Sequence, residues 1–362
     1  MSKKLKSKDY KIDIDLLSEI CETPGAPGHE QRIREVVLRE VKPLVDEFSI
    51  DNMGNVLAVK KGKKKKKVMV TAHMDEISFI VRHIDENGFL KFLPLGGFDP
   101  KTLTAQRVIV HGKKDIIGVM GCKPIHLMKA SERGKNLELR DFYIDTGLTK
   151  EEVEEIVYVG ATVTRERKLI QMGQCINCKS LDNRLSVYIL IETLRELKKS
   201  RKKLPYDLVA AFTVQEEVGI RGAMTAALST DADFGINLDV TIAFDLPGAK
   251  PEDVTTSLGK GTAIKVMDSS IICDYRMVKF MKETADKSKI TWQPELLAGG
   301  GTDSAGIQRM TPNGGAVVGA LSIPTRHIHQ VIEMAHKADV RDTIDLLKAC
   351  LLEIDDYDWS FK

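Results

Sequence analysis

The sequence lacks the features that would place it in several special classes of protein. No run of apolar residues approaches the 18 that a membrane span requires. The charged segment at residues 1–9 is followed by no apolar stretch, so we expect no secretory signal. Fifty-four basic and 52 acidic residues leave a formal charge of only +2, which predicts no general attraction to nucleic acid or to an anionic membrane. Six cysteines are few for 362 residues and favour reduced thiols in the cytoplasm over a disulfide framework.

The composition is that of a globular chain. Charged residues make up 29% and the hydrophobic set 43%, which argues against disorder. At about 150 residues per domain, the length suggests two domains or one domain with an insertion. The lysine-rich run at 60–67 has no aromatic residues beside it, so we interpret it as a solvated connection and not as a nucleic-acid site.

The order of predicted elements divides the chain into two textures. Apolar periodicity predicts a helix, a turn and a second helix over 16–41, a hairpin over 48–59 and a doubly buried strand over 68–72. Residues 77–167 instead form short β-rich runs separated by turns, with one helix at 149–157. Many short strands at regular spacing are typical of a small barrel or sandwich.

After residue 170, predicted helices and strands alternate again. The helices are expected at 185–197, 277–287 and 340–354, and the strands at 208–214, 235–240, 263–267 and 316–323. Such alternation predicts a parallel sheet that is covered on both faces. The predicted fold class is α/β, with a central mixed, mostly parallel sheet in residues 1–75 and 170–362 and an inserted, β-rich, barrel-like domain at 76–169.

Histidines and carboxylates lie where the predicted strands and the long helix meet, at the edge where open α/β sheets bind their ligands. They are His73 and Asp75, Asp182, Glu216 and Glu217, Asp239, and His327 and His329. Any one of them could cap a helix or face solvent, but convergence of five such positions on one edge favours a functional site. Imidazole and carboxylate groups suit zinc, cobalt or manganese, so we predict a metal site.

The spacing within two of these groups indicates separate roles. His73 and Asp75 are two residues apart and share a face of an extended chain, so Asp75 can accept a hydrogen bond from the imidazole and fix its tautomer. In the adjacent pair Glu216 and Glu217, one carboxylate can bind metal while the other takes a proton from water.

Six blocks of the sequence resemble, in order and spacing, the signature blocks of the TET aminopeptidases, the glutamyl/leucyl (deblocking aminopeptidase-like) family of two-metal enzymes. They cover nearly the whole chain and read His73-Met-Asp-Glu, Leu181-Asp-Asn-Arg184, Val214-Gln-Glu-Glu-Val-Gly219, Leu258-Gly-Lys-Gly-Thr-Ala263, Gly299-Gly-Gly-Thr-Asp303 and Pro324-Thr-Arg-His-Ile-His329. The last block departs from the family pattern, because His327 stands where the family has an aromatic residue. His329 aligns with the family's ligand, but His327 shares its face of an extended chain and remains an alternative.

The resemblance implies five metal ligands in two groups that share one aspartate: His73 and Asp239 for one ion, Glu217 and His329 for the other, and Asp182 between them. It also implies that Asp75 orients His73, that Glu216 is the general base, and that the peptide bond after Asp182 is cis. The fold implied is a phosphorylase/peptidase-like α/β domain with an inserted barrel that pairs subunits.

The activity implied is that of a metallo-aminopeptidase. Two divalent ions, Zn²⁺ or Co²⁺, would activate a water that releases N-terminal amino acids from short peptides with a free N-terminus. The subunits would assemble into a tetrahedral homododecamer, without nucleic acid or membrane as a partner. The alternatives are a dimetal deacylase or carboxypeptidase, which the same ligands could serve, and a catalytically silent scaffold that self-assembles.

Overall fold

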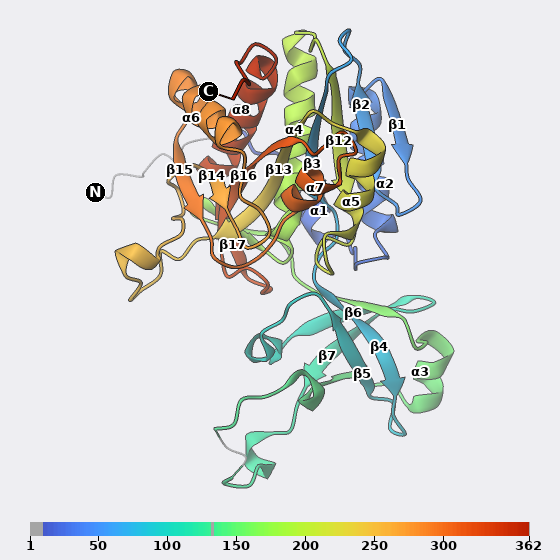
Figure 1. The fold of residues 1–362 in the computed structure, drawn as a ribbon. Helices are drawn as coiled ribbons and strands as arrows, with labels where there is room; N and C mark the ends of the chain where they lie inside the picture. The colour runs from blue at the N-terminus through green and yellow to red at the C-terminus, as the bar shows by residue number, and fades with distance from the viewer. Residues whose placement is uncertain (1–9, 132–133, 362) are drawn as a thin grey trace, which may run out of the picture.

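The computed structural model describes residues 10–131 and 134–361, and Figure 1 shows that they form two bodies. A large α/β body contains both ends of the described chain, and a smaller β-rich body is joined to it by two connections that lie side by side. The charged segment at residues 1–9 lies outside the described residues. Among the described residues, no helix combines the length and the apolar composition needed to cross a membrane.

One mixed sheet forms the centre of the large body. Its main path runs, from edge to edge, through β1 (Glu47–Ile50), β2 (Val56–Lys60), β12 (Asp207–Thr213), β3 (Lys67–His73), β13 (Phe234–Ile242), β16 (Val317–Arg326), β17 (Glu333–His336), β11 (Cys175–Cys178) and β10 (Ile170–Met172). The strands β14 (Thr262–Met267) and β15 (Trp292–Leu296) extend the sheet beside β16. The four central strands β12, β3, β13 and β16 are parallel, so their carboxyl ends meet at one edge.

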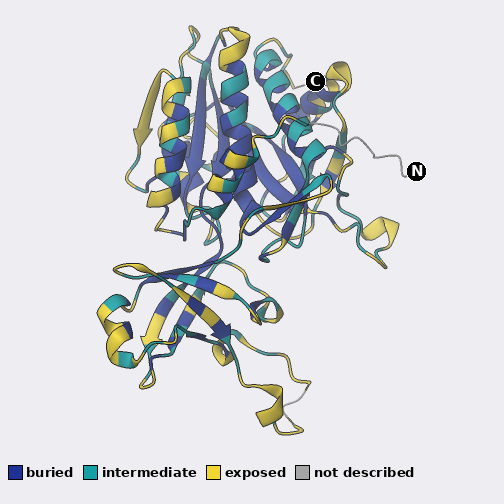
Figure 2. Cartoon of the chain, turned by 180° about the vertical axis from the view of Figure 1, so that it is seen from behind, coloured by how far each residue is buried: buried dark blue, intermediate teal, exposed yellow. Residues whose placement is uncertain are grey.

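Helices cover both faces of this sheet, and Figure 2 shows its central strands as buried. One layer contains α1 (Ile14–Glu22), α2 (Gln31–Val41), α4 (Leu181–Ser200), α6 (Tyr275–Ser288) and α8 (Lys337–Glu353). On the opposite face, α5 (Arg221–Thr230) and α7 (Ser304–Met310) pack against each other and against the central strands. Because both faces are covered, β3 is buried along almost its whole length and reads as a continuous apolar run.

The smaller body is a closed barrel with its own apolar core. Its strands follow the order β4 (Ser78–Ile84), β5 (Leu90–Leu95), β8 (Tyr143–Asp145), β7 (Asp115–Gly121), β6 (Arg107–His111) and β9 (Thr162–Arg165), and β9 closes the ring by pairing with β4. The helix α3 (Lys150–Ile156) starts with a capping box between Thr149 and Glu152. Short helical turns complete the fold at Lys42–Leu44, Pro100–Leu103, Ile125–Leu127, Leu139–Asp141 and Pro251–Asp253.

The predicted fold class is confirmed, since a mixed sheet with a parallel centre is interrupted by a closed β-barrel. The exact domain limits at residues 76 and 169 stay a prediction. Sequence periodicity missed α5, α7 and the short strands β8, β10, β11, β15 and β17. The barrel starts five residues after β3 ends, and Gly97 of the barrel lines the same cavity as the carboxyl ends of the central strands.

Candidate metal centre

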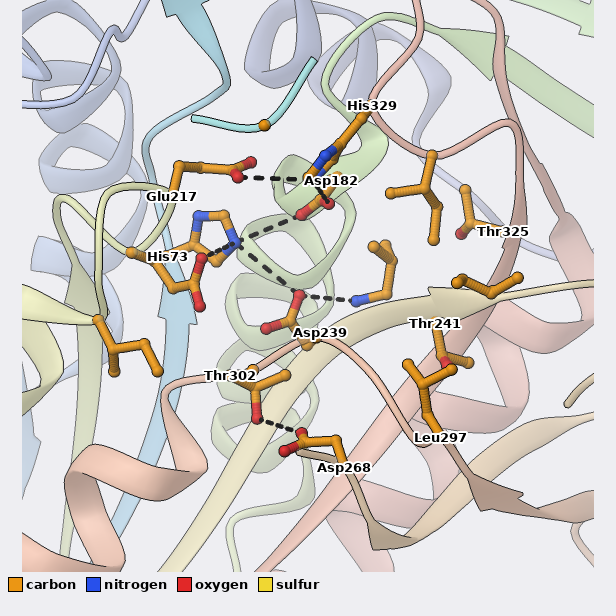
Figure 3. Close-up of a pocket in the computed structure, with 18 of the residues that line it drawn as sticks. His73, Asp182, Glu217, Asp239, Thr241, Asp268, Leu297, Thr302, Thr325 and His329 are labelled. Atoms are coloured by element: carbon orange, nitrogen blue, oxygen red, sulfur yellow. Dashed lines mark hydrogen bonds and ion pairs between the residues drawn. The ribbon is translucent and has the colours of Figure 1, made fainter. Parts of the chain in front are cut away.

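A cavity of about 600 Å³ lies at the carboxyl edge of the parallel strands. Figure 3 shows that imidazole and carboxylate groups from different elements point toward one another in it. Its lining includes all five predicted metal ligands together with Glu216 and His327. Sequence reasoning therefore found residues that the fold brings to one place, although they are spread over more than 250 positions of the chain.

The first group of candidate ligands is held by two neighbouring strands. His73 is the last residue of β3 and Asp239 lies in β13, and both are buried. The Nε2 atom of His73 lies 3.4 Å from an oxygen of Asp182 and 3.8 Å from an oxygen of Asp239. These three side chains place one ligand atom each within 4.8 Å of one another, which fits a metal ion.

The second group is held by loops and shares Asp182 with the first. The Nε2 atom of His329 lies 3.3 Å from the other oxygen of Asp182 and 3.5 Å from an oxygen of Glu217. One oxygen of Glu217 is buried and has no hydrogen-bond partner among the described residues, so it is available to a ligand. His327 also lines the cavity, but it belongs to neither group of candidate ligands.

The electrostatics of the cavity favour added positive charge. Burial, reinforced by neighbouring carboxylates, raises the pKa of Glu216 and of Glu217 well above the usual carboxyl value. Burial also raises the pKa of Asp239 to about 8. Burial would likewise raise the pKa of Asp182, but its hydrogen bonds with the two imidazoles outweigh burial and lower it. Divalent cations would neutralise the negative charge of these clustered carboxylates, and the oxygen and nitrogen donors suit such ions.

Asp75 connects the two groups through hydrogen bonds to the backbone. One carboxylate oxygen accepts the N–H of Glu216 at 3.0 Å and the other accepts the N–H of Glu217 at 3.1 Å. The Nδ1 atom of His73 lies 3.4 Å from Asp75 Oδ1 and 3.2 Å from its backbone carbonyl oxygen. The chain before Glu216 turns sharply, because Gln215 has a φ of 55°. Asp75 therefore touches the imidazole, as the sequence suggested, and also fixes the turn that carries both glutamates.

Glu333 has a similar part on the other side of the cavity, and sequence reasoning missed it. Its fully buried carboxylate accepts the N–H of Asp182 at 3.0 Å and the N–H of His329 at 2.9 Å. It begins the four-residue strand β17, for which no period-2 pattern was evident. The available signal was a carboxylate four residues after a candidate ligand.

A buried ionic cluster next to the centre accounts for the last residue of the Leu181-Asp-Asn-Arg184 block. The guanidinium of Arg184 donates to backbone carbonyls of Met74 at 2.6 Å, and of Ile20 and Thr23 at 2.6 and 2.7 Å. It lies 3.6 Å from Glu76, which also accepts two hydrogen bonds from Lys179 at 2.7 and 2.8 Å. The peptide bond between Asp182 and Asn183 is cis, as the resemblance implies.

The far wall of the cavity is polar and internally paired. Lys265 lies 2.6 Å from Glu295 and 3.1 Å from Asp268, and all three are buried. Thr241 donates to Glu295 at 2.7 Å, and Thr302 donates to Asp268 at 3.3 Å. Figure 3 shows Thr241, Asp268, Thr302 and Leu297 on the side of the cavity away from His329. Leu297 adds an apolar side chain to this otherwise polar wall.

Comparisons with known proteins show the family to which the chain belongs. The family model of the M42 glutamyl aminopeptidases matches residues 54–346. The lysyl aminopeptidase of Pyrococcus furiosus is 34% identical over 360 residues, which cover 96% of this chain and 99% of that protein. Two solved structures are also similar to this chain.

The TET aminopeptidase from a marine sediment Thaumarchaeota archaeon has a TM-score of 0.90 and 34% identity, covering 93% of this chain and 95% of that one. The TET1 peptidase of Pyrococcus horikoshii, which assembles into a tetrahedron or a large octahedral shell, has a TM-score of 0.83 and 30% identity, covering 93% and 98%. The chain is therefore a hydrolase that acts on peptides and belongs to the M42 glutamyl aminopeptidase family.

Proposed function

We propose that this aminopeptidase uses two divalent ions in the cavity to remove N-terminal residues from short peptides. The observation that carries the proposal is the position of Asp182, whose two oxygens face two different histidines at 3.4 and 3.3 Å. His73 and Asp239 would complete the first metal site, and Glu217 and His329 would complete the second. Zn²⁺ and Co²⁺ both suit these ligands.

Divalent ions held there would lower the pKa of a water molecule and polarise the carbonyl of the scissile bond. We assign the proton transfers to Glu216, which lines the cavity 3.8 Å from His73 Nε2 and belongs to neither group of candidate ligands. Its carboxylate would take a proton from the attacking water and then return it to the leaving amine. Asp75 would keep the imidazole of His73 and the backbone of Glu216 in place.

The substrate would be a peptide with a free N-terminus. A protonated N-terminal amine is attracted by the carboxylates that line the cavity, whereas an acylated N-terminus carries no positive charge. We further propose that the barrel pairs subunits and that the chain forms a tetrahedral dodecamer, which would limit entry to short peptides. The similarity to the self-assembling Pyrococcus horikoshii peptidase supports this assembly. A cytoplasmic location is supported by the six cysteines, all of which are free thiols.

The experiment that tests the proposal measures release of amino acids from a mixed set of short peptides. Each peptide is offered with a free and with an acetylated N-terminus, to enzyme that is metal-loaded or treated with chelator. We expect cleavage of the free peptides only, its loss with chelator and its recovery with Zn²⁺ or Co²⁺. Equal cleavage of acetylated peptides would instead support a deacylase or an endopeptidase. Release from the carboxyl end would indicate a carboxypeptidase, and no cleavage by metal-loaded protein would favour a silent scaffold.

A further inference from the structure

Glu333 joins two residues that the proposed function places on the second metal. The two donors to its carboxylate, the N–H groups of Asp182 and His329, lie 147 positions apart in the chain, and each of them uses a different carboxylate oxygen. The bonds go to the backbone of these residues and leave their side chains free to face the cavity. Glu333 thus fixes the distance between two chain segments without itself lining the cavity.

The carboxylate of Glu333 is in turn held firmly. Its strand β17 pairs with β11, where Glu333 is opposite Cys178, and with β16, where Ala335 is opposite Thr325. The side-chain amide of Asn177 donates to the backbone carbonyl of Ile332 at 2.7 Å and to that of Glu333 at 3.1 Å. The carboxylate therefore projects from a fixed point of the sheet toward the loops around the site.

The segments that Glu333 joins need such support. His329 has a φ of 64°, a left-handed conformation that is unfavourable for a residue other than glycine. Its loop contributes no strand or helix at that position. Asp182 precedes the regular part of α4, since its own ψ of 105° is not helical. The left-handed backbone of His329 persists where the surroundings over-determine it.

We propose that Glu333 is a positioning residue that builds the second metal site. This inference rests on the proposed two-metal function. Two of the three ligands of the second group, Asp182 and His329, are held by Glu333, but only Asp182 is shared with the first group. Loss of Glu333 therefore weakens binding of the second ion much more than binding of the first. Mutation of a residue that hydrogen-bonds to metal ligands typically lowers metal affinity 10–100-fold.

The test titrates the metal-free full-length protein with Co²⁺, followed by visible absorption, and with Zn²⁺ in competition with a chelator. The variant Glu333→Gln has the same shape but only one acceptor oxygen, so one of the two backbone N–H groups loses its partner. The matched control is Asp339→Asn. Asp339 is another fully buried carboxylate that accepts two backbone N–H groups, from Gly259 at 2.7 Å and Gly261 at 2.8 Å, and it lies outside the cavity lining.

We expect two ions in the wild type and in Asp339→Asn, but a second ion bound 10–100-fold more weakly in Glu333→Gln. Equal affinities in wild type and Glu333→Gln would overturn the inference while leaving the proposed function intact. Equal weakening in both variants would do the same, because it would show a general effect of removing a buried carboxylate. A wild type that binds fewer than two ions would overturn both this inference and the proposed function.

A second variant keeps the test valid if Glu333→Gln does not fold. Asn177→Ala removes the amide that holds the backbone of Glu333 but leaves its carboxylate present. We expect weaker binding of the same second ion, by a smaller factor than in Glu333→Gln. Unchanged binding of the second ion in Asn177→Ala, with Glu333→Gln unfolded, would count against a positioning role.

Discussion

The two halves of the candidate metal centre are built in different ways. His73 and Asp239 project from β3 and β13, which pair directly in the sheet, and their side chains are only 1% and 6% exposed. Glu217 and His329 lie instead on the loops that follow β12 and β16, and the His329 side chain is 38% exposed. The pairing of β3 with β13 therefore fixes the positions of His73 and Asp239, whereas the positions of Glu217 and His329 depend on the conformation of two loops.

Where loops carry the candidate ligands, buried carboxylates hold the loop backbone in place by accepting hydrogen bonds from its N–H groups. Asp75 accepts the N–H of Glu217, and Glu333 accepts the N–H of His329. Each of these carboxylates accepts a second backbone N–H, from Glu216 and Asp182 respectively. Sites carried by loops are precise only when a supporting shell fixes them. The comparison therefore predicts that the strand-held half tolerates loss of its supports better than the loop-held half.

The largest effect is expected where the two halves meet. Asp182→Asn removes a charged ligand from both groups but keeps the backbone N–H that Glu333 accepts. Because the metal ions supply several kcal/mol of transition-state stabilisation, and each 1.36 kcal/mol is a factor of ten, kcat/KM should fall by at least about 10³-fold. Steady-state kinetics on a free peptide, with metal content measured in parallel, checks this. Activity above a tenth of wild type would show that Asp182 is not shared.

The next effect should separate chemistry from metal binding. Glu216→Gln keeps the size of the side chain and the N–H that Asp75 accepts, but it removes the proton acceptor. We expect turnover to fall by about 10²–10⁴-fold, the usual contribution of a general base, while both ions and the fold are retained. Turnover is measured on metal-saturated enzyme, and bound metal is counted by mass spectrometry. Near-normal turnover with both ions present would contradict the role of Glu216.

The strand-held half of the site was the easier half to predict from sequence. His73 follows a continuous apolar run and is the last residue of β3, as predicted. Asp239 follows another apolar run, but it was wrongly placed at a strand end, because β13 continues to Ile242. The barrel was also predictable, because its short strands alternate with turn residues. The assignment of ligands to two separate ions came from the resemblance, since spacing alone does not say which loops meet.

Glu333 and the turn at Gln215 carry only a weak signal in the sequence, for physical reasons. The strand β17 has only four residues and starts with a charged one, so it carries no periodic apolar signal. The bonds of Glu333 join backbone groups that are far apart in sequence, and backbone groups are common to every residue type. Similarly, α5 and α7 are short helices that contain only two large apolar residues each, so they show little apolar periodicity.

A smaller effect should distinguish the two histidines of the loop-held half. Both His327 and His329 have left-handed backbone, with φ values of 62° and 64°, so glycine is tolerated at either position. We expect His329→Gly to lose the second ion and His327→Gly to bind both, because only His329 lies in a group of candidate ligands. Metal stoichiometry after dialysis at a fixed free Zn²⁺ concentration measures the difference. If His327→Gly lost an ion and His329→Gly did not, the assignment of the two histidines would be reversed.

The smallest effect is expected at Asp339 and concerns stability. Its carboxylate also accepts two backbone N–H groups, but it lies outside the lining of the cavity. Burial raises the pKa of Asp339 to about 7, against an ordinary value of 3.8. Between about pH 4 and pH 7 the unfolded chain releases this proton while the folded protein keeps it, so rising pH favours unfolding. The free energy of unfolding should lose at most about 4 kcal/mol across that range through this group.

Asp339→Asn removes this titration and leaves the metal ligands untouched. The stability of the variant relative to wild type should therefore increase from pH 4.5 to pH 7.5, whatever constant cost the lost hydrogen bond adds. Urea unfolding of the metal-free proteins at several pH values measures the difference. A difference that does not change with pH would mean that Asp339 is already ionised in the folded protein at pH 4.5. In that case its two backbone N–H bonds outweigh burial, and a carboxylate that holds a loop in this protein is charged even where no metal is near.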